Sequence, residues 1–285
     1  MKKFIAIVVA IVAFVPFYSC DKEETSTEHY LILKFKFDPT QARLNNLGQP
    51  TTVPAGHAAQ SPVFNTISSH YVEMAPNANT QLGQGTVLYH APETTAGGAT
   101  AIDFSQAKIV AQDEVFLKIP LKQVTAGTYQ WMRVSLSYQN YGITVRHSGA
   151  DYQGTLASFV GFNNYITNHS IGNAFFTVNG NRSQGYWAFA LNDFPYSSSG
   201  QAPAGATTVP NPLAATSPIP AGSCVVTGQF AVPLQISGNE SKDVVVKLSL
   251  STRCVSGLQL RPVQYSSAVW CEQPVREETY ARRFG

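Results

Sequence analysis

Residues 131–138 read WMRVSLSY, in which Met, Val, Leu and Tyr alternate with a mostly polar set of side chains. Successive side chains of a β-strand point to opposite faces, so a period of two indicates a strand with one buried face. The even-numbered residues from Met132 to Tyr138 are predicted to face a core, and the odd-numbered residues from Trp131 to Ser137 to face the other way. Residues 29–37 (HYLILKFKF) end in the same alternation.

Similar β-prone runs recur along the chain, separated by Gly, Pro, Ser and Asn, and beyond the N-terminus no run shows the 3.6-residue period of an amphipathic helix. This pattern predicts an all-β fold, an immunoglobulin-like or jelly-roll-like antiparallel β-sandwich, in one domain over residues 29–252. Residues 197–223, rich in Ser, Pro, Gly, Ala and Thr, are predicted to be a long loop or linker. The predicted strands are 29–37, 63–74, 86–90, 115–121, 129–138, 142–147, 155–162, 174–178, 185–191, 224–236 and 243–251.

The N-terminal residues have the charged, apolar and small-residue zones of a secretory signal. The apolar run 4–17 is shorter than the ~20 residues that a permanent transmembrane helix needs. Cys20 follows Ser19, the small residue that a lipoprotein signal peptidase requires. We therefore predict a lipoprotein signal peptide over residues 1–19 and lipidation of Cys20. The alternative is an ordinary signal peptide that is cut elsewhere and contains an incidental cysteine.

The residues after this cysteine predict the location of the protein. Residues 20–28 are polar and bury little apolar surface, so we expect a flexible, lipidated tether. The acidic residues in DKEE (21–24) resemble the signal that sends some Gram-negative lipoproteins to the outer surface. We expect a protein anchored by lipid in the outer membrane, either periplasmic or exposed at the cell surface.

The charge of the mature chain argues against a nucleic-acid partner. Cleavage would remove Lys2 and Lys3, which leaves 17 of the 19 Lys and Arg against 17 Asp and Glu. Phosphate binding depends on clustered cations, and no basic run is present. No second apolar segment approaches membrane-spanning length, so the expected membrane contact is the lipid on Cys20.

Residues 253–285 differ in composition from the rest of the chain. They hold five of the nine arginines, no lysine, and two of the four cysteines. A frameshifted or misassembled reading frame is the preferred hypothesis, and a terminal segment with its own role is the alternative. The pairing among Cys224, Cys254 and Cys271 stays open, because three cysteines allow at most one intramolecular disulfide. Cys224–Cys254 and Cys254–Cys271 are equal candidates in an oxidising compartment.

Catalytic signatures such as G-x-S-x-G, H-E-x-x-H, the P-loop and G-x-G-x-x-G are missing from the sequence. We therefore expect a binding protein and not an enzyme. The most suggestive group is His70 and Met74 in SSHYVEMAP together with His90 in VLYHAP. Imidazole and thioether ligands favour copper, and residues four apart share one face of a strand. The alternative is that these are isolated surface histidines and a core methionine.

Three segments resemble the MbnP-like group of copper-handling lipoproteins in their order: FNTISSHYVEMAP, GTVLYHAPETTAGGATAIDF and VTAGTYQWMRVSLSYQNYGI. The resemblance covers residues 29–146 and implies a periplasmic or surface β-protein. In that group histidines and a modified tryptophan hold copper, which implies roles for His70, His90 and Trp131 here. The usual G-V-P…N-H ending and the cysteine pattern of the group are absent.

Aromatic residues support a second hypothesis, a glycan-binding surface module. Trp131 is predicted on the polar face of its strand, and QGYWAF places Tyr186 and Trp187 beside amide side chains. Rings that stack on sugars and amides that bind hydroxyls are how sandwich domains hold glycans. A purely structural envelope protein without a ligand is the third hypothesis, and a buried core tryptophan is the alternative for Trp187.

Overall fold

The computed structural model describes residues 28–38, 52, 58–202, 217–220, 222–251, 254–256, 269–270 and 275–278. The predicted signal peptide, the lipidation site Cys20 and most of the tether lie outside the described residues, as does most of 253–285. Within the described part of the chain, no helix is long and apolar enough to cross a membrane.

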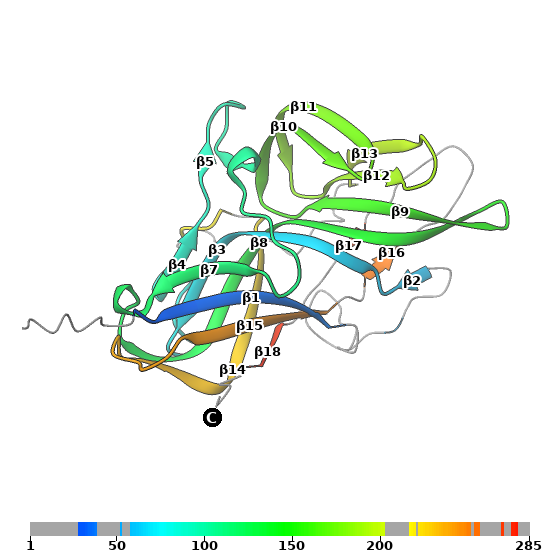
Figure 1. The fold of residues 1–285 in the computed structure, drawn as a ribbon. Coiled ribbons are helices and arrows are strands. Elements are labelled where there is room, and N and C mark those ends of the chain that lie inside the picture. Colours follow the sequence, from blue (N-terminus) through cyan, green and yellow to red (C-terminus); the bar gives the residue numbers. More distant parts are fainter. Residues whose placement is uncertain are drawn as a thin grey trace, which may run out of the picture.

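The protein is an all-β sandwich of curled, mainly antiparallel sheets, as the sequence predicted (Figure 1). In the described ranges the helical elements are two short 3-10 turns, η1 (Phe104–Gln106) and η2 (Leu121–Gln123). The strands are β1 (Tyr30–Asp38), β2 (Ala58–Gln60), β3 (Val63–Ala75), β4 (Thr86–His90), β5 (Glu93–Thr94), β6 (Ala101–Asp103), β7 (Val115–Pro120), β8 (Gly127–His147), β9 (Ala150–Phe159), β10 (Asn163–Ile171), β11 (Ala174–Ser183), β12 (Tyr186–Leu191), β13 (Ser197–Gln201), β14 (Cys224–Ile236), β15 (Val244–Ser251), β16 (Cys254–Ser256), β17 (Val269–Trp270) and β18 (Val275–Glu278).

The largest sheet is organised around β8. Its order is β13-β12-β9-β8-β3-β4, and β14 pairs with the first half of β8 on the edge that β9 occupies along the second half. The predicted strands 129–138 and 142–147 are therefore one strand of 21 residues. Residues 139–141 continue the ladder because both neighbours pair with them, β9 on one side and β3 on the other.

Two four-stranded sheets pack against the large sheet, and β17, β16 and β2 form a separate three-stranded sheet in that order. The first has the order β18-β15-β1-β7 and encloses the main core with β3, β8 and β14 (Figure 1). The second has the order β11-β10-β6-β5 and encloses a second core with β9 and β12. Two pairs, β1 with β15 and β6 with β10, are parallel, and the long chain segments between their members allow this.

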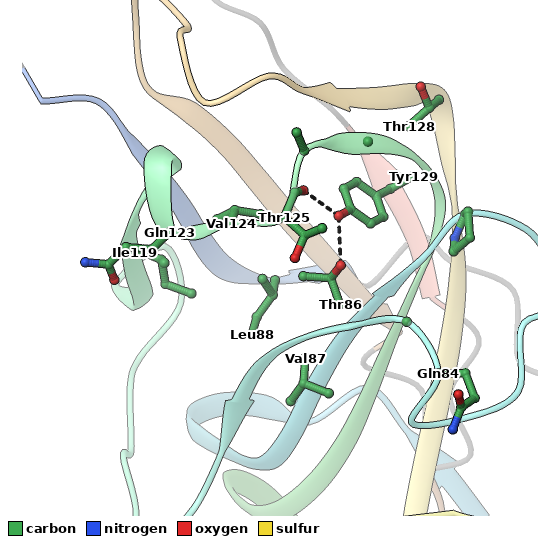
Figure 2. Close-up of a pocket in the computed structure, with 14 residues that line it drawn as sticks. Gln84, Thr86, Val87, Leu88, Ile119, Gln123, Val124, Thr125, Thr128 and Tyr129 are labelled. Carbon is green, nitrogen blue, oxygen red and sulfur yellow. Dashed lines mark hydrogen bonds between the residues drawn. The ribbon is translucent and has the colours of Figure 1, made fainter.

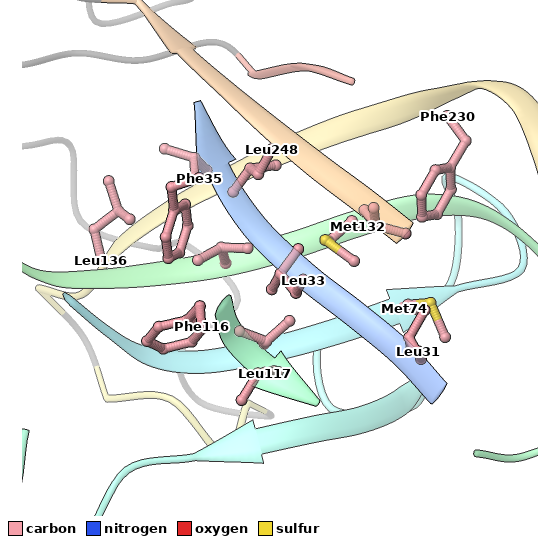
Figure 3. Close-up of a cluster of buried hydrophobic side chains, with 14 of the residues drawn as sticks. Leu31, Leu33, Phe35, Met74, Phe116, Leu117, Met132, Leu136, Phe230 and Leu248 are labelled. Carbon is pink, nitrogen blue, oxygen red and sulfur yellow. The ribbon is translucent and has the colours of Figure 1, made fainter. Parts of the chain in front are cut away.

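The main core contains the apolar residues that the period of two selected (Figure 3). Along β1 the residues Leu33, Phe35 and Phe37 are buried while Lys34 and Lys36 are only partly covered. From β8 the even-numbered residues up to Leu136 enter the same core. Burying each large apolar side chain stabilises the fold by about 1.5–3 kcal/mol, so this pattern fixes which face of each strand turns inward.

Two strands of five or more residues were not predicted, in addition to the short strands β2, β5, β6, β16, β17 and β18. β10 (Asn163–Ile171) was not predicted, because its apolar residues are interrupted by polar side chains, of which Asn164 and His169 are buried. β13 (Ser197–Gln201) occupies the beginning of the predicted linker, and it pairs with β12 as the edge strand of the large sheet. Residues 203–216 of that linker lie outside the described residues.

Candidate metal centre

Three side chains of the types that can bind metals meet where the chain passes from the large sheet to a smaller one. His70 lies in β3, His90 ends β4, and Glu93 begins β5, which pairs with β6 in the second small sheet. Only Ala91 and Pro92 separate β4 from β5, so the crossover is short (Figure 1). Tyr71 of β3 faces His90 across the ladder, which brings the adjacent His70 close to that end of β4.

A β-bulge places His70 in this position. The pairing of β3 with β8 passes from Ser69 directly to Tyr71, so His70 has no partner residue on β8. A bulge disturbs the regular alternation of side chains and redirects the extra residue. The His70 ring packs at 4.7 Å from the His90 ring and at 5.3 Å from Phe162, measured between centroids.

The donor atoms have the spacing of a metal site. His70 Nε2 lies 2.9 Å and His90 Nε2 lies 3.5 Å from Glu93 Oε1. One ligand atom from each of the three residues lies within 4.8 Å of the others. Two donors bound to one tetrahedral ion at ~2.0–2.1 Å lie roughly 3.3 Å apart, so the observed distances need only small side-chain adjustments to hold an ion.

Burial keeps His70 in the form that binds metals. Its side chain is 0% exposed, and this loss of solvation, together with repulsion from His90, lowers the pKa of His70 to about 4 against the opposing effect of Glu93. The imidazole is therefore neutral at pH 7, as a ligand must be. Its Nε2 contacts the Glu93 carboxylate, and its Nδ1 is buried with no hydrogen-bond partner in the described part of the chain.

A buried carboxylate supports the His90 side of the cluster. The Glu73 side chain accepts hydrogen bonds of 2.7 Å from the amides of Gly83 and Gly85, immediately before β4, and one of 3.1 Å from the Tyr71 hydroxyl. Burial and the Glu73 charge raise the pKa of Tyr71, so its hydroxyl stays protonated and donates. The Tyr71 ring meets the His90 ring edge-on at 5.8 Å between centroids, so the hydrogen bonds around Glu73 also position a neighbour of His90.

The other two residues predicted to bind copper lie elsewhere. Met74 is fully buried in the main core, next to Met132 across the ladder (Figure 3). Trp131 pairs with Ala75 at the end of β3. Four and five residues of strand separate His70 from Met74 and Ala75, which corresponds to roughly 13 and 16 Å along β3. The structure thus brings His70 and His90 together and places Met74 and Trp131 further along the strands.

Two of the three aromatic residues predicted to stack on sugars, Tyr186 and Trp187, are covered by protein, whereas Trp131 is half-buried. Tyr186 is 5% exposed in the second core, and Trp187 is 7% exposed against Tyr141 and Leu156. A Cβ atom on Gly200 of β13 would lie 2.8 Å from the Trp187 ring, so the edge strand covers it closely. Neither ring is available to stack on a glycan.

A separate groove of about 640 Å³ lies at the opposite end of β4 (Figure 2). The Tyr129 hydroxyl donates to the carbonyl oxygen of Thr125 at 2.6 Å and lies 2.8 Å from the Thr86 hydroxyl. The lining contains amide, hydroxyl and apolar groups but no carboxylate, histidine, lysine or arginine. This groove offers hydrogen bonds and apolar contact, and it lacks a general base with a pKa near neutrality.

Sequence reasoning missed Glu93 and the bulge. The spacing His90-Ala-Pro-Glu93 was a usable signal, because an acidic residue three positions after a histidine can bind the same metal ion. The bulge had no signal in the sequence, since it depends on how β3 pairs with β8.

The fold and the cluster together define an all-β sandwich with a candidate site of two histidines and one glutamate. Comparison with protein families, with curated proteins and with solved structures gave no match to this chain. The resemblance to the MbnP-like group therefore stays a prediction.

Proposed function

We propose that this protein binds one divalent transition-metal ion through His70, His90 and Glu93. The observation that carries the proposal is the convergence of these three donors from three strands, with all ligand atoms within 4.8 Å. The buried, neutral His70 supplies a fixed donor, and the Glu93 carboxylate supplies the negative charge that a dication favours. When His70 binds through Nε2, its remaining proton lies on Nδ1.

The donor set favours copper in its +2 state, with zinc as the competitor. Imidazole suits both ions, whereas Cu(I) favours soft sulfur ligands, and Met74 is not part of the cluster. At a site of given geometry, Cu(II) binds more tightly than Zn(II). The copper ligand predicted from the sequence is thus retained in the proposal, with Glu93 replacing Met74 and Trp131.

The setting that we propose is the cell envelope. A lipid on Cys20 would hold the sandwich at the outer membrane, in the periplasm or at the surface, and the protein would bind its metal without catalysing a reaction. The resemblance to copper-handling lipoproteins supports the use of His70 and His90.

Metal titration of the protein lacking residues 1–20 tests the proposal. We expect uptake of about one equivalent of Cu(II) and weaker binding of Zn(II). Isothermal titration calorimetry measures both. An ion at 100 times its Kd stabilises the native state by about 2.7 kcal/mol. For a chain of this size that corresponds to a rise in Tm of roughly 5–10 °C.

Single substitutions assign the ligands. We expect His90→Ala and Glu93→Gln to remove most of the affinity, and His70→Ala to do the same if it folds. The matched control is His147→Ala, because His147 is exposed near the tip of the β8–β9 hairpin and outside the cluster. Met74→Leu should also leave the affinity unchanged. Absence of metal uptake by the wild-type protein would refute the proposal.

A further inference from the structure

The three protein donors leave the coordination of the bound ion incomplete. Structural metal sites are closed by four protein ligands, whereas sites with three protein ligands keep a position for water or another molecule. In the part of the chain that the structure describes, the cluster includes no fourth His, Cys, Asp or Glu.

The exposure of the donors shows on which side the incomplete position lies. The His70 side chain is 0% exposed, whereas those of His90 and Glu93 are 43% and 26% exposed. Phe162 covers the His70 ring, and Tyr71 flanks one edge of the His90 ring. An ion at the cluster would therefore have protein behind it, on the His70 side, and solvent in front of it, on the side of His90 and Glu93.

The charge of the loaded site favours certain incoming ligands. Two neutral imidazoles and one carboxylate around a dication leave a net charge of +1. The neighbouring carboxylate of Glu73 is already engaged by backbone amides and by Arg133 at 3.6 Å, and so does not neutralise this charge. An anionic ligand gains Coulombic attraction at such a site, and a neutral imidazole supplies the nitrogen donor that Cu(II) prefers.

We propose that the ion held by His70, His90 and Glu93 takes a fourth ligand from solution, a small anion or an imidazole group, on the exposed side formed by His90 and Glu93. This inference rests on the proposed function. It makes the site one that exchanges ligands: an incoming donor joins the coordination shell before the protein ligands leave. A carrier of metal ions requires this property, and a structural metal site does not.

Spectroscopic titration of the copper-loaded protein tests the inference. Azide and, in a second series, imidazole are added to protein that holds one equivalent of Cu(II), and the visible and electron paramagnetic resonance spectra are followed. We expect a saturable change for each ligand, with a new azide-to-copper charge-transfer band, and copper that remains with the protein after desalting. Spectra that neither ligand alters, or copper that is stripped from the protein, would overturn the inference.

Chemical rescue tests which side is open. Imidazole in solution should restore copper binding to His90→Ala, whose missing side chain leaves an exposed position, and should not restore it to His70→Ala, whose position is enclosed. Rescue of both variants or of neither would contradict the proposed direction. If the wild-type protein takes up no copper, the proposed function fails. If it takes up copper whose spectra do not change when azide or imidazole is added, only the inference fails.

Discussion

Acid should destabilise this protein through a second buried histidine. His169 of β10 is 6% exposed, and neither of its ring nitrogens has a hydrogen-bond partner within the described part of the chain. Its ring stacks on Phe176 at 5.0 Å and meets Phe159 at 5.2 Å between centroids. Burial among these rings lowers the pKa of His169 to about 4, because the charged imidazolium would lose its hydration there.

The size of this loss of stability follows from the difference between the pKa of His169 in the native state and in the unfolded state. With an unfolded pKa of about 6.5 and a native pKa of about 4, the unfolded state binds a proton more readily than the native state. The contribution of the neutral His169 to the free energy of unfolding is fully present above pH 6.5 and is lost as the pH falls toward 4. At pH 5 the loss is about 2 kcal/mol, and below pH 4 it reaches about 3.4 kcal/mol. The lowered pKa of His70 acts in the same direction.

The substitution His169→Leu isolates this effect. Leucine has a similar volume, cannot be protonated, and removes two unsatisfied nitrogens whose burial costs about 1–3 kcal/mol. We expect a variant that is at least as stable as wild type at pH 8 and loses about 2 kcal/mol less between pH 8 and pH 5. The assay is urea unfolding at a series of pH values in the presence of a chelator. An equal acid-induced loss in both proteins would refute the reasoning, and the exposed His147→Leu serves as the control.

Two further substitutions test a buried ion pair and the packing of a buried ring. Glu73→Gln should lower the free energy of unfolding by about 3–5 kcal/mol, because it leaves the buried Arg133 without its counter-charge; an unchanged urea midpoint would contradict this. Trp187→Ala should cost about 3–5 kcal/mol of stability through the cavity it leaves under β13. The same urea measurement checks it, and the exposed Val232→Ala, which should change stability little, is the control.

Much of the fold could be predicted from the sequence because alternation is a local property. The period of two identified β1 and the buried face of β8, and each of the eleven predicted runs begins or ends within three residues of an observed strand boundary. Among the strands of five or more residues, two were missed. β10 carries buried polar residues that only the surrounding sheets make tolerable, and β13 is a Ser-rich edge strand stabilised by pairing with β12.

Sequence reasoning predicted two of the three residues of the candidate site, His70 and His90, and missed Glu93. Ligand chemistry selected His70 and His90, and the structure brings them together. A regular strand would have put Met74 on the same face as His70, and the bulge at His70 breaks that regularity. Tyr186 and Trp187 were candidates for an exposed platform, but alternation specifies that two neighbouring residues face opposite ways and not whether each face is covered.

The sequence by itself determined that the chain forms sheets, which side chains of β1 and β8 face the core, and which residues have the chemistry to bind a metal. The tertiary structure alone decided that Glu93 joins the two histidines and that the rings of Tyr186 and Trp187 are buried. The physical reason is that side-chain direction is set between neighbours in the chain, whereas burial and ligand convergence depend on strands that meet across long separations. β3, β4 and β5 create the site because the crossover after His90 carries Glu93 from one sheet to another.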